Sequence, residues 1–137
     1  MIEQNQQSNP TGKLTIRALA MPADTNPAGD IFGGWVMSQL DIAGAICASE
    51  VVRGRTATVA VEAMTFIAPV KVGDVLCVYC EVESIGNTSI SIRVEAWSRR
   101  NKFYDRVKVT QATFVYVALG EDGKKRKIER HEPPLAT

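Results

Sequence analysis

The sequence predicts an α+β domain in which one long helix is wrapped by a five-stranded antiparallel sheet. Apolar residues with helical character begin near Gly33 or Gly34 and continue to about Val52. One segment before this helix and four after it alternate apolar and polar residues with the period of two that is typical of strands. Because short connections join the four later segments, we expect them to pair antiparallel and to curl around the helix.

Turn residues mark the boundaries of the predicted strands. Pro69 ends the second strand, and Gly86 and Asn87 turn the chain between the third and the fourth. The strands are expected at residues 14–20, 56–68, 75–85, 89–98 and 104–119. Alternation in the fourth strand places one set of residues toward the core and their neighbours on the opposite face: Ile90, Ile92, Val94 and Ala96 against Ser91, Arg93, Glu95 and Trp97.

The predicted helix is apolar nearly all round, so we expect it to be buried on most faces. When a single sheet packs against one helix, the second face and the edges of the sheet remain uncovered. Since an exposed edge in an apolar sheet invites pairing with another strand, the sequence predicts a homodimer.

Length and composition indicate a single domain. The chain has 137 residues, of which 13–119 form the predicted domain, 1–12 a disordered lead-in and 120–137 a charged, solvated tail. The net charge of +1 favours neither nucleic acid nor an anionic membrane as a partner. The polar N-terminus resembles neither a signal peptide nor a membrane anchor, so we expect a cytoplasmic protein.

Two of the three cysteines, Cys77 and Cys80, form a C-x-x-C motif inside a predicted strand. Strand residues three apart point to opposite faces, so these thiols cannot readily share a metal ion. We therefore interpret them as packing residues and expect no metal site.

Asp41 is the strongest candidate for chemistry, because it is a carboxylate flanked by Leu40 and Ile42 within an apolar helix. Gly44 and Ala45, one turn away, leave room above it. An ionised carboxylate is costly to bury without compensation. Asp41 is interpreted either as a functional acid or as a residue that reaches the helix edge to pair with an arginine or face water.

The helix start at Gly33 and Gly34 is the second candidate. Its free backbone N–H groups favour negative charge on a ligand oxygen. Asp41 lies about 10 Å further along the axis, too far to act on the same oxygen within one helix. A two-fold dimer can bring the helix start of one chain to the carboxylate of the other. The alternative role of the two glycines is a tight turn with close helix packing.

Two further residues are weaker candidates. The amide of Asn26, in the polar loop before the helix, can orient a water or a carbonyl, or it can serve its own turn. Phe66, with Trp35 and Met64, can line an apolar ligand pocket, although such side chains more often belong to a core.

The only histidine, His131, lies in the predicted tail, so a Ser-His-Asp or Cys-His arrangement is unavailable inside the domain. No phosphate-binding glycine loop of the Walker or dinucleotide type is present. A carboxylate with backbone amides suits hydrolysis of an activated ester, whose leaving group needs no strong acid.

Three segments together resemble the YciA-type acyl-CoA thioesterases of the hotdog-fold superfamily over about residues 14–119. They are RALAMPADTNPAGDIFGGWVMSQLDIAGAICASE, VAVEAMTFIAPVKVGDVLCVYCEV and IGNTSISIRVEAW. The resemblance implies the hotdog fold, in which a long helix is wrapped by five antiparallel strands. It also implies pairing into a dimer with a ten-stranded sheet, and usually a hexameric trimer of dimers.

The same resemblance implies roles for individual residues. The helix aspartate, here Asp41, corresponds to the catalytic carboxylate, and Asn26 to an asparagine that related hydrolases use. Gly33 and Gly34 correspond to the Gly-Gly whose amide polarises the thioester carbonyl. The resemblance implies substrate contacts for five further positions: Thr58, approaching from the other subunit, Thr88 and Ser89 at the pantetheine, and Arg99 and Arg100 at the nucleotide phosphates.

These observations predict an acyl-CoA thioesterase of fatty acid metabolism with broad acyl-chain tolerance and no cofactor. An alternative is a non-catalytic acyl-CoA-binding sensor on the same fold. A hotdog dehydratase is a third interpretation, but the dehydratases share a site histidine that this domain lacks.

Overall fold

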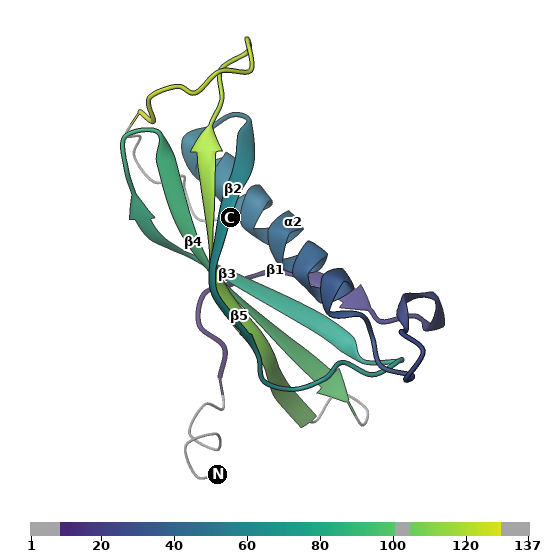
Figure 1. Ribbon diagram of the computed structural model, residues 1–137. Coiled ribbons are helices and arrows are strands. Elements are labelled where there is room, and N and C mark those ends of the chain that lie inside the picture. The colour runs from purple at the N-terminus through teal and green to yellow at the C-terminus, as the bar shows by residue number, and fades with distance from the viewer. Residues whose placement is uncertain (1–8, 101–104, 130–137) are drawn as a thin grey trace.

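The computed structural model describes residues 9–100 and 105–129 (Figure 1). It contains one long helix and five strands, with a short 3-10 turn, η1, at Pro22–Asp24. In chain order the elements are β1 (Lys13–Leu19), α2 (Gly33–Val52), β2 (Thr56–Phe66), β3 (Val75–Ile85), β4 (Ser89–Arg100) and β5 (Asp105–Ala118). Every strand predicted from the alternation is present, and the helix has the predicted bounds.

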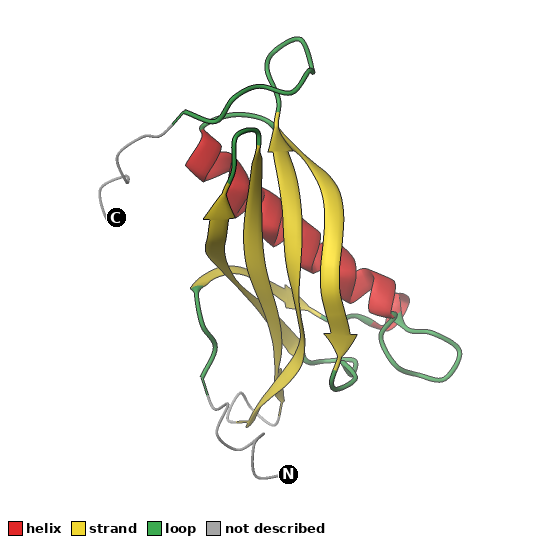
Figure 2. Ribbon diagram, turned by 60° about the vertical axis from the view of Figure 1, so that its left-hand side comes forward, coloured by secondary structure: helices red, strands yellow, loops and turns green. Residues whose placement is uncertain are grey.

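The strands form one antiparallel sheet in the order β1-β3-β4-β5-β2. The helix lies across one face of this curved sheet (Figure 2). The edge strands are therefore β1 and β2, and the helix contacts all five strands. This arrangement confirms the predicted α+β architecture.

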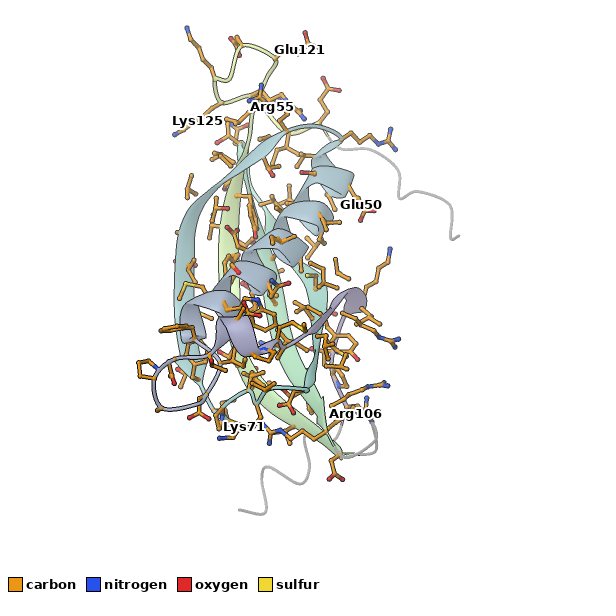
Figure 3. The ribbon with its side chains drawn as sticks, turned by 90° about the vertical axis from the view of Figure 1, so that its right-hand side faces the viewer. Glu50, Arg55, Lys71, Arg106, Glu121 and Lys125 are labelled. Atoms are coloured by element: carbon orange, nitrogen blue, oxygen red, sulfur yellow. The ribbon has the colours of Figure 1, made fainter. Side chains whose placement is uncertain are left out.

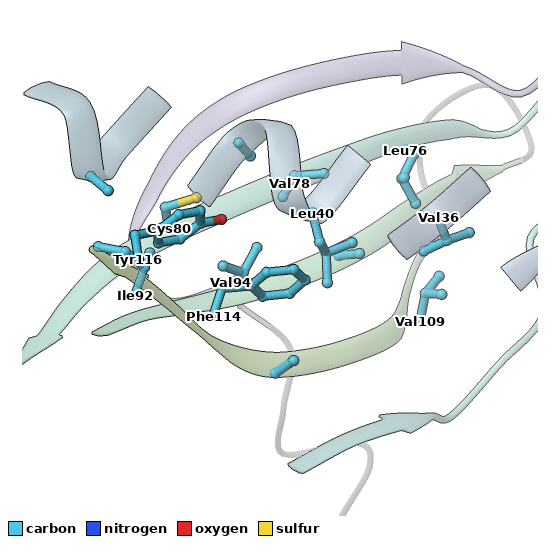
Figure 4. Close-up of a cluster of buried hydrophobic side chains, with 14 of the residues drawn as sticks. Val36, Leu40, Leu76, Val78, Cys80, Ile92, Val94, Val109, Phe114 and Tyr116 are labelled. Atoms are coloured by element: carbon cyan, nitrogen blue, oxygen red, sulfur yellow. The ribbon is translucent and has the colours of Figure 1, made fainter. Parts of the chain in front are cut away.

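The core lies between the helix and the concave face of the sheet (Figure 4). Leu40 is fully buried there, together with Phe114 and Tyr116 of β5. The apolar set of β4 is fully buried as predicted: Ile90, Ile92, Val94 and Ala96. The alternation of β4 therefore identified the core-facing residues correctly.

The helix is not buried on most faces, contrary to the prediction. Met37, Ile42 and Ile46 expose 40%, 50% and 43% of their surfaces, because the sheet of one chain covers only one side of α2. Val59 and Val61 of the edge strand β2 are also exposed, at 55% and 41%. By length and composition alone α2 could cross a membrane, but the core helix of a globular domain meets the same criterion.

The convex face of the sheet is covered in part by residues that were predicted to be a disordered lead-in. Glu95 and Trp97 point away from the helix, yet each is only 2% exposed. Thr11, from the predicted disordered lead-in, donates its hydroxyl and its backbone N–H to the Glu95 carboxylate, and Trp97 donates its indole N–H. At residues 9–12 the lead-in is thus packed on the sheet, whereas residues 1–8 lie outside the described residues.

The predicted solvated tail is wrong for Arg126 and Ile128, although Lys127 between them is exposed. Arg126 donates Nη2–H to the carbonyl of Val52 (2.7 Å) and Nε–H to that of Leu119 (3.1 Å). Ile128 is 4% exposed, and its N–H bonds the carbonyl of Asn87. The last carbonyls of a helix lack partners within it, so the guanidinium stabilises this helix end. The prediction for residues 130–137 lies outside the described residues.

Candidate active site

Asp41 is partly exposed on the side of α2 that faces the edge strand β2. Its Oδ1 accepts a hydrogen bond from the Thr58 hydroxyl at 2.7 Å and lies 3.1 Å from the Tyr116 hydroxyl. The same Tyr116 hydroxyl lies 2.9 Å from the backbone carbonyl of Asp41. The carboxylate is therefore held by hydroxyl groups, and the arginine pair considered from the sequence is not formed with any described residue.

Tyr116 is fully buried beneath the helix, with its ring stacked on Phe114 at a centroid distance of 6.3 Å (Figure 4). Burial, followed by the negative charge of Asp41, raises the pKa of Tyr116 far above its ordinary value. The phenol therefore keeps its proton and acts as a donor. A Cβ on Gly44 would lie 2.2 Å from the Tyr116 oxygen, so only glycine leaves room for the hydroxyl.

The helix start forms a second, separate cluster. Gly33 and Gly34 are exposed, and within residues 9–100 and 105–129 their N–H groups have no hydrogen-bond acceptor. The ring of Phe66 lies over Gly33, since an added Cβ there would meet it at 3.4 Å. At Gly34 an added Cβ would meet nothing within 4 Å, so the space beside its Cα is open. Such an amide can stabilise an oxyanion.

The loop before the helix uses Asn26 to hold its own shape. The Asn26 side-chain oxygen accepts from the N–H groups of Ala28 (2.9 Å) and Asp30 (3.1 Å). Asp30 also pairs with Lys71, which is labelled at this end of the molecule in Figure 3. The turn role considered from the sequence is thus present. The Asn26 side-chain NH2 group makes no hydrogen bond to a described residue, and its predicted role toward a substrate stays a prediction.

The predicted site residues fall into two groups within one chain. Thr58 and Phe66 lie about 25 Å apart along β2, given the rise of a strand. Thr58 contacts Asp41, whereas Phe66 contacts the helix start. Within one chain Thr58 thus lies beside Asp41 and away from the helix start, whereas the resemblance implied that Thr58 approaches from the other subunit.

The predicted CoA contacts are also divided between the two ends of the molecule. Ser89 begins β4 and Arg100 ends it, about 35 Å away. Arg100 donates to the Asp74 carboxylate at 2.8 Å and to the Pro69 carbonyl. Arg99 keeps a buried Nε without a described acceptor. A single chain thus does not bring the Thr88–Ser89 turn and the two arginines together, and their substrate contacts stay predictions.

The described residues contain no group of three or more His, Cys, Asp or Glu side chains placed to hold a metal ion. The chemistry that these groups themselves offer is a carboxylate with one open oxygen, hydroxyl donors and unpaired backbone N–H groups. That set suits general-base or nucleophilic attack on an activated carbonyl.

Comparison with known proteins agrees with this chemistry. The family described as "Thioesterase superfamily" matches residues 28–103, which include Asp41, the helix start and Thr58. The chain belongs to the thioesterase superfamily. Among curated relatives, "Acyl-CoA thioester hydrolase YciA" of Salmonella typhimurium is 53% identical over 124 residues, covering 88% of this chain and 93% of that protein.

Solved thioesterase structures share the fold. HI0827, described as a hexameric broad specificity acyl-coenzyme A thioesterase, superposes with a TM-score of 0.83 at 49% identity, covering 89% of this chain and 84% of that one. The hexameric hotdog fold thioesterase Cj0915 of Campylobacter jejuni gives a TM-score of 0.82 at 43% identity, covering 86% and 91%. This thioesterase therefore has the hotdog fold that the sequence resemblance implied.

Sequence reasoning missed Tyr116 as a site residue. It lies 75 positions from Asp41, within the apolar run FVYVA of the last strand. The available signal was a tyrosine in a core-facing position, whose hydroxyl needs a partner when buried, together with glycine three residues after the helix acid. These two features indicate a hydroxyl that reaches the helix backbone.

Proposed function

We infer that this thioesterase hydrolyses acyl-CoA to a free carboxylic acid and CoA, with Asp41 as the catalytic carboxylate. One observation carries this conclusion. Asp41 presents a carboxylate fixed by Thr58 and Tyr116 on the open side of an apolar helix, at a position within the matched thioesterase family. The curated relatives are acyl-CoA thioester hydrolases, and HI0827 has broad specificity. We expect broad acyl-chain tolerance here as well.

The complete site is shared between two subunits in this proposal. Several apolar residues of α2 and β2 are exposed in the single chain, among them Ile42, Ile46, Val59 and Val61. Pairing of two antiparallel β2 edges around a two-fold axis near Val61 covers part of this apolar surface and makes a ten-stranded sheet. It also brings the Phe66 end of one strand beside the Thr58 end of the other. Gly34 of one chain then meets the partner subunit's Asp41.

Two reaction routes use this arrangement. In the first, Asp41 takes a proton from water, the water oxygen attacks the thioester carbon, and the C–S bond breaks to release CoA as the protonated thiol. In the second, Asp41 attacks the carbon directly, expels the CoA thiolate and forms an anhydride that water then hydrolyses. In both, the Gly34 N–H stabilises the negative charge on the carbonyl oxygen. Label in Asp41 after a single turnover in ¹⁸O-labelled water would identify the anhydride route, because attack of water on the Asp41 carbonyl of the anhydride places the water oxygen there.

The activity itself is tested with a thiol-detecting assay on acyl-CoAs from acetyl to palmitoyl. We expect release of free thiol by the wild-type protein and its loss, by about 1,000-fold or more, in Asp41→Ala. Calorimetry should show that Asp41→Ala still binds CoA. Binding of acyl-CoA by the wild-type protein without thiol release would instead identify the non-catalytic sensor.

Subunit sharing is tested by mixing two inactive variants. Asp41→Ala removes the carboxylate, and Gly34→Pro removes the N–H within the first helical turn, where proline is tolerated. Denaturing and refolding an equal mixture should restore about a quarter of the wild-type turnover, because half of the dimers are mixed and each holds one intact site. Failure of the mixture to exceed either parent, with dimers formed, would place each site within one chain.

We propose further that the dimers assemble as trimers of dimers, in line with the hexameric relatives. We also propose that Asn26 takes part in catalysis, that Thr88 and Ser89 contact the pantetheine of CoA, and that Arg99 and Arg100 contact its phosphates. The reaction requires water and no cofactor, and we place it in the cytoplasm.

A further inference from the structure

We propose that Tyr116 is a positioning residue which, together with Thr58, holds Asp41 by Oδ1 and leaves Oδ2 as the reacting oxygen. This inference deepens the proposed function and rests on it. It assigns different tasks to the two oxygens of one carboxylate, and it names a residue of the last strand as part of the catalytic arrangement.

The hydrogen bonds of Asp41 are one-sided. Both hydroxyl donors, Thr58 at 2.7 Å and Tyr116 at 3.1 Å, meet Oδ1. No donor from residues 9–100 or 105–129 reaches Oδ2. A carboxylate oxygen with two donors is less available to take a proton or to attack a carbon, since its lone pairs are engaged. Oδ2 is therefore the oxygen that meets water or the thioester.

The two donors differ in how firmly they are held. Thr58 is exposed on an edge strand, whereas Tyr116 is fully buried and stacked on Phe114. Gly44 leaves the space that the Tyr116 hydroxyl occupies. The position of that hydroxyl is thus set by the core, and the core thereby sets the rotation of the Asp41 side chain.

The Tyr116 hydroxyl has one hydrogen and two acceptors in reach, Oδ1 and the backbone carbonyl of Asp41 (2.9 Å). When Asp41 is charged, donation to Oδ1 is favoured by the charge. When Asp41 holds a proton during turnover, the hydroxyl can turn to the carbonyl without moving its ring. The carboxylate keeps its place in both states.

The titratable groups that face Tyr116 are Asp41 and Cys47 from α2 and Cys80 from β3. Burial raises the pKa of Cys80 to about 11, and burial together with Glu50 raises that of Cys47. Both thiols therefore stay neutral at physiological pH. Of these three groups, Asp41 is the one that accepts a hydrogen bond from the Tyr116 hydroxyl.

The test compares the pH profiles of thiol release by wild-type, Tyr116→Phe and Thr58→Val proteins. Each substitution deletes one hydroxyl and keeps a similar volume. We expect kcat to fall about tenfold in each single variant, with KM changed less than twofold. We also expect the acidic limb of kcat/KM to move to higher pH, because the charged carboxylate loses a donor. The matched control is Tyr79→Phe, a tyrosine of β3 outside the core cluster, whose profile should match wild type.

A wild-type kcat and an unshifted acidic limb in both Tyr116→Phe and Thr58→Val would overturn the inference. So would a loss in Tyr116→Phe that appears only as lower melting temperature, with unchanged turnover per folded molecule. Thr58→Val keeps the test decisive if Tyr116→Phe does not fold, since Thr58 lies outside the hydrophobic core cluster. Absence of thiol release by the wild-type protein would instead reject the proposed function.

Discussion

Two carboxylates lie on opposite sides of the sheet and have opposite hydrogen-bond environments. Glu95, on the convex face, is 2% exposed and receives donors on both oxygens. Thr11 and Trp97 donate to Oε1, while Thr11 and Arg93 donate to Oε2. Asp41, on the helix side, is partly exposed, and described donors reach only its Oδ1.

The difference separates a structural acid from a reactive one. A carboxylate that is removed from water must be fully compensated, and Glu95 therefore ties the N-terminal segment to the sheet. Asp41 keeps access from outside the core, so it can leave one oxygen open for chemistry. Each acid has apolar neighbours in the sequence, QLDIAG for Asp41 and RVEAW for Glu95, so the sequence alone does not show which donors each one meets.

The largest expected effects come from exchanging each acid for its amide. Asp41→Asn should lower kcat by about 1,000-fold or more. It should change the unfolding free energy by less than about 1 kcal/mol, because the NH2 group can replace Oδ2, which receives no described donor. Glu95→Gln should keep the turnover per folded molecule and lower stability by about 2 kcal/mol, because an NH2 group then faces the donors of Arg93 and Thr11. Thiol release and thermal melting measure the two effects.

Each amide variant is the control for the other. If Glu95→Gln removed turnover at an unchanged melting temperature, Glu95 would be functional and the contrast between the two acids would fail. A large loss of stability in Asp41→Asn would equally show that Asp41 supports the fold.

A smaller effect is expected from Gly44→Ala. The added Cβ would lie 2.2 Å from the Tyr116 oxygen and 3.0 Å from Cζ, so the ring must move and its hydroxyl leaves Asp41. We expect a stability loss of about 2 kcal/mol, although alanine is otherwise the better helix former. We expect kcat to fall about tenfold.

The double variant Gly44→Ala/Tyr116→Phe provides the control for this clash. Removing the phenol oxygen should recover part of the melting temperature lost in Gly44→Ala, while turnover stays low. If the two stability losses were simply additive, the contact between Gly44 and Tyr116 would not be the cause.

The smallest effect concerns acid stability. Burial acts to raise the pKa of Glu95, but hydrogen bonds from Thr11 and Trp97 and the charge of Lys108 outweigh it, so this pKa lies below its ordinary value of 4.5. The charged form then stabilises the fold above about pH 4.5, and this contribution is lost as the pH falls through the lower folded value. Melting temperatures between pH 6 and pH 3 should fall less steeply for Glu95→Gln than for wild type. Equal slopes would contradict this assignment.

Much of the fold was predictable because its signals are local. The period of two identified the five strands, and the apolar run beginning at Gly33 identified the helix. The same patterns overestimated how much of α2 one chain buries, because an all-round apolar helix indicates total burial without saying which chain supplies the cover. They also placed Glu95 and Trp97 on the outer face correctly, yet gave no sign that Thr11 covers them.

By itself the sequence determined the helix, the strands, their facing residues and the acid in the middle of the helix. Tertiary structure alone decided what that acid meets. Tyr116 reaches Asp41 across 75 positions and Thr11 reaches Glu95 across 84. Backbone periodicity specifies which way a side chain points, whereas its partner depends on which distant strand the fold packs opposite it. The open oxygen of Asp41 is a property of that packing.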